Sequence, residues 1–211
     1  MKLFIYQHCP FCLRAQMIVG LKSLPVDIDI IMEGDTETPT RMVGRKVVPI
    51  LQKEDGSYMP ESMDIVHYLD SKQAPQVATG TVDAAIEAWC KQVSKSAFNL
   101  AVPRFTKGDF AELATPAARE AYRLREEKAF GDLEQLIADT PALLADVESQ
   151  LVALEPLVAE RHSIDITDFI LFPVLRSLTI VKNIHFGDQV QAYLARVAGA
   201  TGVSLLTEQA M

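Results

Sequence analysis

The sequence predicts an α/β domain followed by an all-helical domain. Within residues 1–72, short apolar runs suited to β-strands alternate with segments of helical periodicity. The segment 73–84 contains Pro75, Gly80 and small polar residues without an apolar period, so we interpret it as an interdomain linker. Every apolar pattern within 85–211 is helical. We therefore expect two domains joined by this linker.

The composition is typical of a globular protein. The 211 residues, 49% of them hydrophobic and 23% charged, are enough to bury a sizeable core. A net charge of −8 argues against sequence-independent nucleic-acid binding, and no stretch has membrane-spanning length. The start of the chain has no leader-like pattern, and only two of the three cysteines lie close together, which favours a reducing compartment. We expect an unprocessed cytoplasmic monomer, because no interface signal is visible.

A pair of cysteines stands at the first predicted strand-to-helix junction. The run 2–6 suits a strand, and Pro10 suits the first turn of a helix whose apolar positions then recur four residues apart. Cys9 would lie at the helix N-terminus, where free amides and the helix dipole stabilise a thiolate. Cys12 lies one turn further in, within reach of Cys9 but more buried. The motif Cys9-Pro10-Phe11-Cys12 therefore predicts a redox pair with Cys9 as the nucleophile.

Two other uses of the cysteine pair fit the sequence less well. A zinc site needs two more ligands, but Cys90 has no partner pair and the four histidines are scattered, so we expect no metal. A structural disulfide across so short a loop would constrain the unfolded chain little. We assign Cys90 and its neighbour Trp89 to packing.

The rest of the first domain contains three further predicted strands and two further helices. Alternation over 26–32 predicts a half-buried strand, and Thr38-Pro39 and Gly44 mark the ends of a short helix. A strand over 47–51 accommodates Pro49 at its start, and a turn at 54–57 leads to a return strand at 58–59. Ser62 is expected to cap the next helix.

The second domain contains repeated helix-start signals. The helical face of residues 85–100 ends near Pro103, and Thr115-Pro116 and Thr140-Pro141 each predict an N-cap followed by a first-turn proline. The run 169–175 is apolar all round, which indicates a helix at the centre of the domain. We expect Asp165 to cap this helix, with Asp168 also at its N-terminus.

Taken together, these motifs resemble those of the glutaredoxins. The resemblance rests on Cys9-Pro10-Phe11-Cys12 after the first strand, Val48-Pro49, and Glu61-Ser62 opening a helix. The length, the helical second half and the Asp165-to-Asp168 helix are similar to the glutathione-transferase architecture found in large two-domain bacterial glutaredoxins. The resemblance implies a thioredoxin-like N-terminal domain and a glutathione-transferase-like C-terminal domain.

The resemblance also implies a glutathione site. Val48-Pro49 would form a cis peptide bond that leaves the Val48 backbone free to pair with the cysteinyl portion of glutathione. Glu61 would receive the ammonium group and Ser62 would bind the carboxylate of the γ-glutamyl end. The residues alone also allow a trans proline at an edge strand, a simple helix cap and a solvated acid. None of Arg41, Arg45 and Lys46 matches a pattern for the glycyl carboxylate.

Other residues around the cysteines have supporting roles. Pro10 and Phe11 separate the two thiols, and Tyr6 at the end of the first strand either packs against them or belongs to the core. We expect His8 to be a partly exposed loop residue, because the helix N-terminus can already activate Cys9. Arg14 is expected only to solvate the helix surface.

The resemblance implies a glutathione-dependent thiol–disulfide oxidoreductase, with glutathione as the reducing co-substrate. Its substrates would be glutathione mixed disulfides and protein disulfides. A cysteine-type glutathione transferase or dehydroascorbate reductase shares the architecture but usually lacks the second cysteine, so Cys12 favours oxidoreduction. A non-enzymatic binding protein is the third candidate, and the intact cysteines, Pro49 and Glu61-Ser62 argue against it. Fold alone does not separate these functions.

Overall fold

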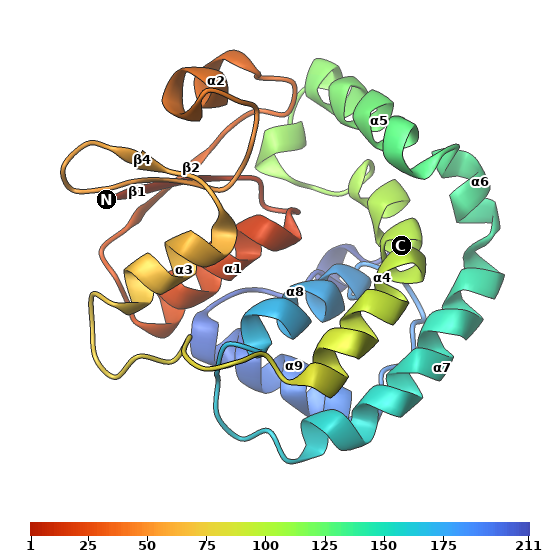
Figure 1. Cartoon of the computed structure of the whole chain (residues 1–211). Helices are drawn as coiled ribbons and strands as arrows, with labels where there is room; N and C mark the ends of the chain where they lie inside the picture. Colours follow the sequence, from red (N-terminus) through yellow and green to blue (C-terminus); the bar gives the residue numbers. More distant parts are fainter.

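The computed structural model describes residues 1–211, and its N-terminal part is a four-stranded mixed sheet with three helices (Figure 1). The strands follow the order β2-β1-β3-β4, with β1 parallel to β2 and antiparallel to β3. β3 is antiparallel to β4, to which it is joined by a hairpin. The elements are β1 (Lys2–Ile5), α1 (Pro10–Leu21), β2 (Asp27–Ile30), α2 (Glu37–Val43), β3 (Ile50–Gln52), β4 (Tyr58–Met59) and α3 (Ser62–Asp70).

Alternation along β1 divides its side chains between the two faces of the sheet. Leu3 and Ile5 belong to the main core, on the side covered by α1 and α3 (Figure 1). Phe4 and Tyr6 belong to a smaller cluster with residues of and after α2, on the opposite side. Tyr6 is thus buried at the end of β1, next to the start of α1.

The C-terminal part is helical, and α8 lies at its centre (Figure 1). Every residue of α8 except Ile170 is buried, in agreement with the predicted central helix. The elements are α4 (Ala84–Phe105), the short 3-10 helix η1 (Ala111–Leu113), α5 (Pro116–Phe130), α6 (Leu133–Ala138), α7 (Thr140–Ala159), α8 (Asp168–Leu178), α9 (Asp188–Thr201) and η2 (Thr207–Gln209). No helix has the length and apolar content needed to span a membrane.

Several local predictions for the N-terminal part are confirmed and others are wrong in detail. Gly44 ends α2 in the left-handed conformation, and Pro49 precedes β3. β2, in contrast, is an exposed edge strand rather than a half-buried one, with Ile28 47% exposed, because no strand pairs with its outer edge. α2 begins before Thr38, whose amide donates to Asp35 Oδ1 at 2.9 Å.

In the second half, two helix starts differ from prediction, and one helix, α6, begins where no start was predicted. Thr115 caps α5 as expected, but Gly131, with φ of 85°, ends that helix, and Asp132 caps a separate α6. α7 begins at Thr140 itself, with Asp139 at the N-cap position. Asp165 is not the N-cap of α8, because Thr167 occupies that position and donates its amide to Asp165 Oδ1 at 2.8 Å.

The two parts of the chain share one continuous hydrophobic core. α1 of the N-terminal part packs against α8 and α9, and the core cluster includes residues from both sides of this contact. The connection between α3 and α4 is held in place, because the carboxylate of Asp70 accepts from the amides of Val77 and Ala78. Lys22 pairs with Asp70 at 2.7 Å and donates to the Pro75 carbonyl at 2.9 Å. The connecting segment therefore follows a defined path.

Candidate active site

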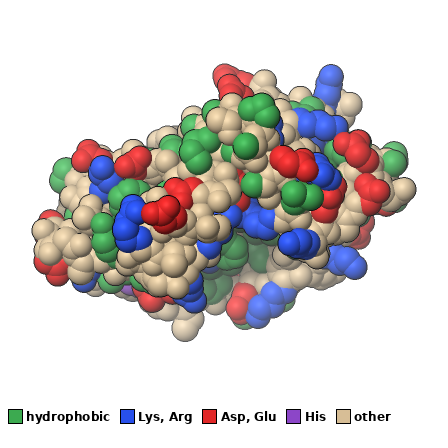
Figure 2. All heavy atoms as spheres, turned by 90° about the horizontal axis from the view of Figure 1, so that it is seen from above, with side chains coloured by type: hydrophobic (Ala, Val, Ile, Leu, Met, Phe, Trp, Pro, Cys, Tyr) green, Lys and Arg blue, Asp and Glu red, His purple; other side chains and the backbone are tan.

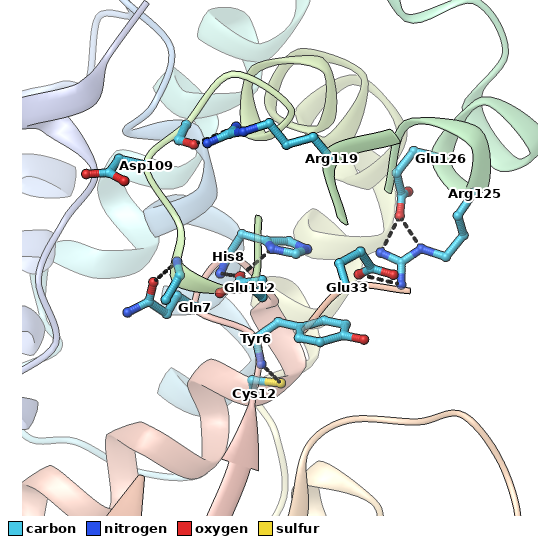
Figure 3. A network of polar contacts seen from close by, with 12 residues as sticks. Tyr6, Gln7, His8, Cys12, Glu33, Asp109, Glu112, Arg119, Arg125 and Glu126 are labelled. Atoms are coloured by element: carbon cyan, nitrogen blue, oxygen red, sulfur yellow. Dashed lines mark hydrogen bonds and ion pairs between the residues drawn. The ribbon is translucent and has the colours of Figure 1, made fainter. Parts of the chain in front are cut away.

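Cys9 and Cys12 lie at the start of α1, as the sequence predicts. Cys9 occupies the N-cap position and Pro10 the first helical turn. Both thiols are free; Cys9 is half-buried and Cys12 is fully buried. The amide of Tyr6 donates to Cys12 Sγ at 3.4 Å (Figure 3). One turn of helix thus brings together one accessible and one enclosed sulfur.

The surroundings move the pKa values of the two thiols in opposite directions. The pKa of Cys9 is lowered to about 7, mainly by hydrogen bonding from the Cys12 side chain. Burial acts in the opposite direction and raises this pKa. The charge of His8 and the backbone amides of Cys12 and Phe11 lower it further. Burial, followed by the interaction with Cys9, raises the pKa of Cys12 well above its usual value. Cys9 is therefore the group that ionises near neutral pH, which makes it the stronger candidate for the nucleophile.

A cleft of about 520 Å³ opens beside Cys9, between the sheet domain and the helices α4 and α5. Figure 2 shows the molecule hollowed between its two parts, with hydrophobic side chains inside the hollow. The peptide bond between Val48 and Pro49 is cis, as the resemblance implied, and Val48 lines the cleft while Pro49 is buried. The remaining lining includes predicted site residues and aromatic residues of the helical part, among them Tyr6, Pro10, Phe11, Phe98, Phe105 and Tyr122.

Glu61 and Ser62 lie at the start of α3, but not in the predicted capping arrangement. Glu61 occupies the N-cap position, and Ser62 is the first residue of the helix. Glu61 has φ of 71°, an unusual conformation for a residue with a side chain and one found most often at functional sites. Its exposed carboxylate pairs with Arg45, one of the three basic residues that the sequence left unassigned.

Arg14 connects the redox helix to Ser62, a link that the sequence did not predict. Its guanidinium lies 4.9 Å from the centre of the Phe11 ring, and its Nη1 donates to Ser62 Oγ at 3.4 Å. Phe11 is itself 53% exposed. The half-buried Arg14 therefore does more than solvate the surface of α1, because it joins the starts of α1 and α3.

The prediction for His8 is wrong, because this residue is buried, with only 5% of its surface exposed. Its ring stacks on Tyr6, with centroids 5.7 Å apart, and meets the Tyr122 ring edge-on at 4.8 Å. Its Nδ1 lies 2.6 Å from Oε1 of Glu112, a fully buried residue of η1 (Figure 3). The helical part of the chain covers the loop before Cys9. No local feature of that loop predicts this burial.

A second polar contact joins the two parts of the chain near Tyr6 (Figure 3). The buried carboxylate of Glu33, beyond β2, pairs with Arg125 of α5 at 3.1 Å and with Lys46 at 2.9 Å. Burial, with a contribution from Glu33, raises the pKa of Tyr6 far above its usual value, so its hydroxyl stays protonated. Glu33, Arg125 and Glu112 carry no sequence motif, because their importance arises from contacts between distant segments.

The two residues that the sequence assigns to packing, Trp89 and Cys90, lie in the helical domain. Trp89 and Cys90 are buried in α4, with Trp89 Nε1 donating to the Gln150 carbonyl at 2.7 Å, and burial raises the pKa of Cys90 to about 11. No cluster of three or more His, Cys, Asp or Glu side chains is arranged to hold a metal ion.

Comparisons with known proteins agree with this architecture. The family model "Glutaredoxin 2, C terminal domain" matches residues 85–210, and "Glutathione S-transferase, N-terminal domain" matches residues 3–76. Glutaredoxin 2 of Escherichia coli K12 is 43% identical over 215 aligned residues, which cover 100% of both chains.

Solved structures extend the same result. Glutaredoxin 2 from Salmonella typhimurium, crystallised in complex with glutathione, superposes with a TM-score of 0.96 at 41% identity, covering 100% of this chain and 98% of the other. The glutathione transferase GSTFuA2 from Phanerochaete chrysosporium, at 14% identity with a TM-score of 0.67 and covering 96% and 98% of the two chains, shares the fold. The expected thioredoxin-like domain and glutathione-transferase-like helical domain are confirmed. The chain thus belongs to the glutaredoxin 2 family of glutathione-dependent disulfide oxidoreductases.

Proposed function

We propose that the chain reduces glutathione mixed disulfides and protein disulfides through Cys9 and Cys12, with glutathione as the reducing co-substrate. The observation that carries this proposal is the contrast between the two thiols: Cys9 is accessible, with a pKa of about 7, whereas Cys12 is buried and its pKa is raised. A thiol that ionises near ambient pH is well suited to attack a disulfide, because it combines a large thiolate fraction with good nucleophilicity.

With a glutathione mixed disulfide, Cys9 alone completes the cycle. The Cys9 thiolate attacks the glutathione sulfur, an S–S bond forms between Cys9 and glutathione, and the substrate thiolate leaves and takes up a proton. The thiolate of a second glutathione attacks the bound glutathione sulfur. Oxidised glutathione then leaves, and the Cys9 thiolate is restored.

With a protein disulfide, Cys12 is required as well. Cys9 first forms a mixed disulfide with the protein, and Cys12, deprotonated in this step, attacks Cys9 Sγ and displaces the reduced protein thiolate. Two glutathione molecules then reduce the Cys9–Cys12 disulfide. The placement of Cys9 at the N-cap and of Cys12 in the first turn of α1 supports this role, because residues three apart in a helix lie on the same face.

The proposed glutathione site extends from Val48 to the start of α3. The backbone of Val48, next to the cis bond with Pro49, would pair with the cysteinyl portion, while Ser62 and the N-terminus of α3 would bind the γ-glutamyl carboxylate. Glu61 would receive the ammonium group and exchange part of its ion pair with Arg45 for it. The relative from Salmonella typhimurium was crystallised with glutathione, which supports glutathione as the ligand here.

We further propose that the protein acts as a monomer in the cytoplasm. Three free cysteines favour a reducing compartment, and the net charge of −8 disfavours nucleic acid as a partner. Its partners would be glutathione and proteins that carry glutathionylated or disulfide-bonded cysteines, with no association with membranes.

Substitution of each cysteine tests the mechanism in a glutathione-coupled assay. Cys9→Ser should abolish turnover of both substrate classes, because serine is not ionised at neutral pH. Cys12→Ser should keep the reduction of a glutathione mixed disulfide and lose the reduction of a protein disulfide. Cys90→Ser, a control for removal of a buried thiol in α4, should keep both.

Two results of this assay would contradict the proposal. Retained turnover in Cys9→Ser together with loss in Cys12→Ser would reverse the assigned roles. Conjugation of an electrophile to glutathione faster than disulfide reduction would favour a cysteine-type transferase, the alternative that shares this architecture.

A further inference from the structure

The helical domain contributes a carboxylate that reaches the residue directly before Cys9. Glu112 lies on η1 and is fully buried, and its Oε1 accepts from the backbone amide of His8 at 3.0 Å. The same oxygen lies 2.6 Å from His8 Nδ1. Figure 3 shows the His8 ring lying against Glu112 on one side and above Tyr6 on the other. Glu112 thus fixes both the backbone and the ring of His8.

The chemistry of this contact fixes which nitrogen of His8 carries a proton. Burial alone would raise the pKa of Glu112, but hydrogen bonds from His8 and its charge lower it overall, so Glu112 is a carboxylate at neutral pH. A carboxylate oxygen can only accept, so Nδ1 donates. The ring lines the same cleft as Cys9.

We propose that Glu112 is a positioning residue for disulfide exchange, which holds His8 beside Cys9 so that the positive charge of the His8 ring stabilises the Cys9 thiolate. The inference rests on the proposed role of Cys9 as nucleophile. Glu112 makes no contact with the reacting sulfurs and acts through His8. The same logic operates where a carboxylate orients a histidine that activates a nucleophile.

The other charged groups near His8 do not take over this role. Two of these groups are the thiols of Cys9 and Cys12 themselves. The hydroxyls of Tyr6 and Tyr122 carry no charge, because burial raises the pKa of both and keeps them protonated. Arg176 of α8 donates to the Gln7 carbonyl at 3.0 Å and, as a cation, supplies no negative charge to His8.

The other nearby carboxylates are paired with cations. Glu33 pairs with Lys46 and with Arg125, and Glu126, which lines the same cleft, also pairs with Arg125. The only salt bridge of His8 is the one with Glu112. Glu112 is therefore the carboxylate whose charge acts on the imidazole through a direct hydrogen bond.

The sign of the effect separates this proposal from a direct action of the Glu112 charge. A carboxylate near a thiolate repels it, so removal of the Glu112 charge would by itself lower the pKa of Cys9. If Glu112 acts by holding the His8 ring beside Cys9, its removal weakens the stabilisation of the thiolate and raises the pKa of Cys9. The two accounts predict shifts in opposite directions.

The test measures the rate of Cys9 alkylation by iodoacetamide against pH in the full-length protein, with the modified cysteine identified by mass spectrometry. In Glu112→Gln the midpoint should rise by roughly one unit, the scale expected for loss of a neighbouring opposite charge. Glu112→Asp, which keeps the charge, should show a smaller rise. Asp168→Asn removes another fully buried carboxylate, in α8, and should leave the midpoint unchanged.

A second variant makes the result independent of the folding of Glu112→Gln. His8→Asn removes the titratable ring but keeps an amide that can donate to Glu112, and it should raise the midpoint in the same way. Adding Glu112→Gln to His8→Asn should cause no further rise. Retained turnover in Cys9→Ser would contradict the proposed function, whereas an unchanged or lowered midpoint in either Glu112→Gln or His8→Asn would overturn only the present inference.

Discussion

At the scale of single residues, the main feature is that two identical side chains three positions apart have opposite acid–base behaviour. Cys9 lies at the N-cap of α1 and faces the cleft, where the Cys12 side chain, His8 and nearby amides all stabilise its anion. Cys12 is enclosed by the end of β1 and the core, where burial penalises charge. Environment alone therefore gives the two thiols the different acid–base properties that the proposed disulfide exchange requires.

A residue-scale prediction follows from the interaction that lowers the Cys9 pKa most. Cys12→Ala removes the hydrogen-bond donor and should raise the Cys9 pKa by roughly one unit from its value of about 7, so that less thiolate is present at neutral pH. Cys12→Ser keeps a donor and should remain closer to the wild type. Alkylation rates followed across pH measure both midpoints, and identical midpoints in the two variants would rule out the hydrogen bond as the main cause.

At the scale of elements, α1 connects the candidate active site to the helical domain. Its first turn carries the thiols, and its last turns pack against α9. Gly20 makes this approach close, because a Cβ atom at that position would lie 1.8 Å from the carbonyl oxygen of Thr201. Glycine in the interior of a helix is normally unfavourable, so its presence here is explained by packing.

The element-scale prediction compares two helical glycines. Gly20→Ala should destabilise the protein by ~1–3 kcal/mol, the usual cost of overpacking, because the obstructing atom belongs to the backbone of α9. Gly199→Ala, in α9, meets no atom within 4 Å and should be neutral or stabilising by up to ~1 kcal/mol. Denaturant unfolding of both variants measures the difference, and equal or greater stability in Gly20→Ala would disprove the close contact.

At the scale of the whole molecule, the two domains form one structural unit. One hydrophobic core extends across both, and Lys22 and Asp70 fix the connecting segment. The amide of Glu33 donates to the Glu112 carbonyl at 3.0 Å, so the segment after β2 is also tied to η1. The cleft beside Cys9 has one wall from each domain, and its shape therefore depends on their mutual packing.

The whole-molecule prediction concerns cooperativity. Trp89, the only tryptophan, lies in α4 and reports the helical domain by its fluorescence, while exposure of the buried Cys12 thiol reports the sheet domain. Because the core is shared, both signals should change at the same denaturant concentration, as expected for a two-state transition. Two separate midpoints would show that the domains unfold independently.

Much of this architecture could be predicted because its signals are local. The cysteine pair at a strand-to-helix junction, the left-handed Gly44, the cap at Thr115 and the uniformly apolar α8 each depend on residues a few positions apart. Local signals failed where a neighbouring residue could fill the same capping role. At the start of α2, Asp35 Oδ1 accepts from the amide of Thr38, the residue that was predicted as the cap.

The sequence by itself determined the order of the elements, the redox motif and the family resemblance, since periodicity, capping and thiol spacing are short-range properties of the chain. Only the tertiary structure decided that His8 is buried against Glu112, that Arg14 reaches Ser62, and that Glu33 joins Lys46 to Arg125. These contacts join segments up to 104 positions apart, and their formation depends on the packing of α1 against α8 and α9. The physical reason is that burial and charge pairing depend on distance in space, which no local pattern encodes.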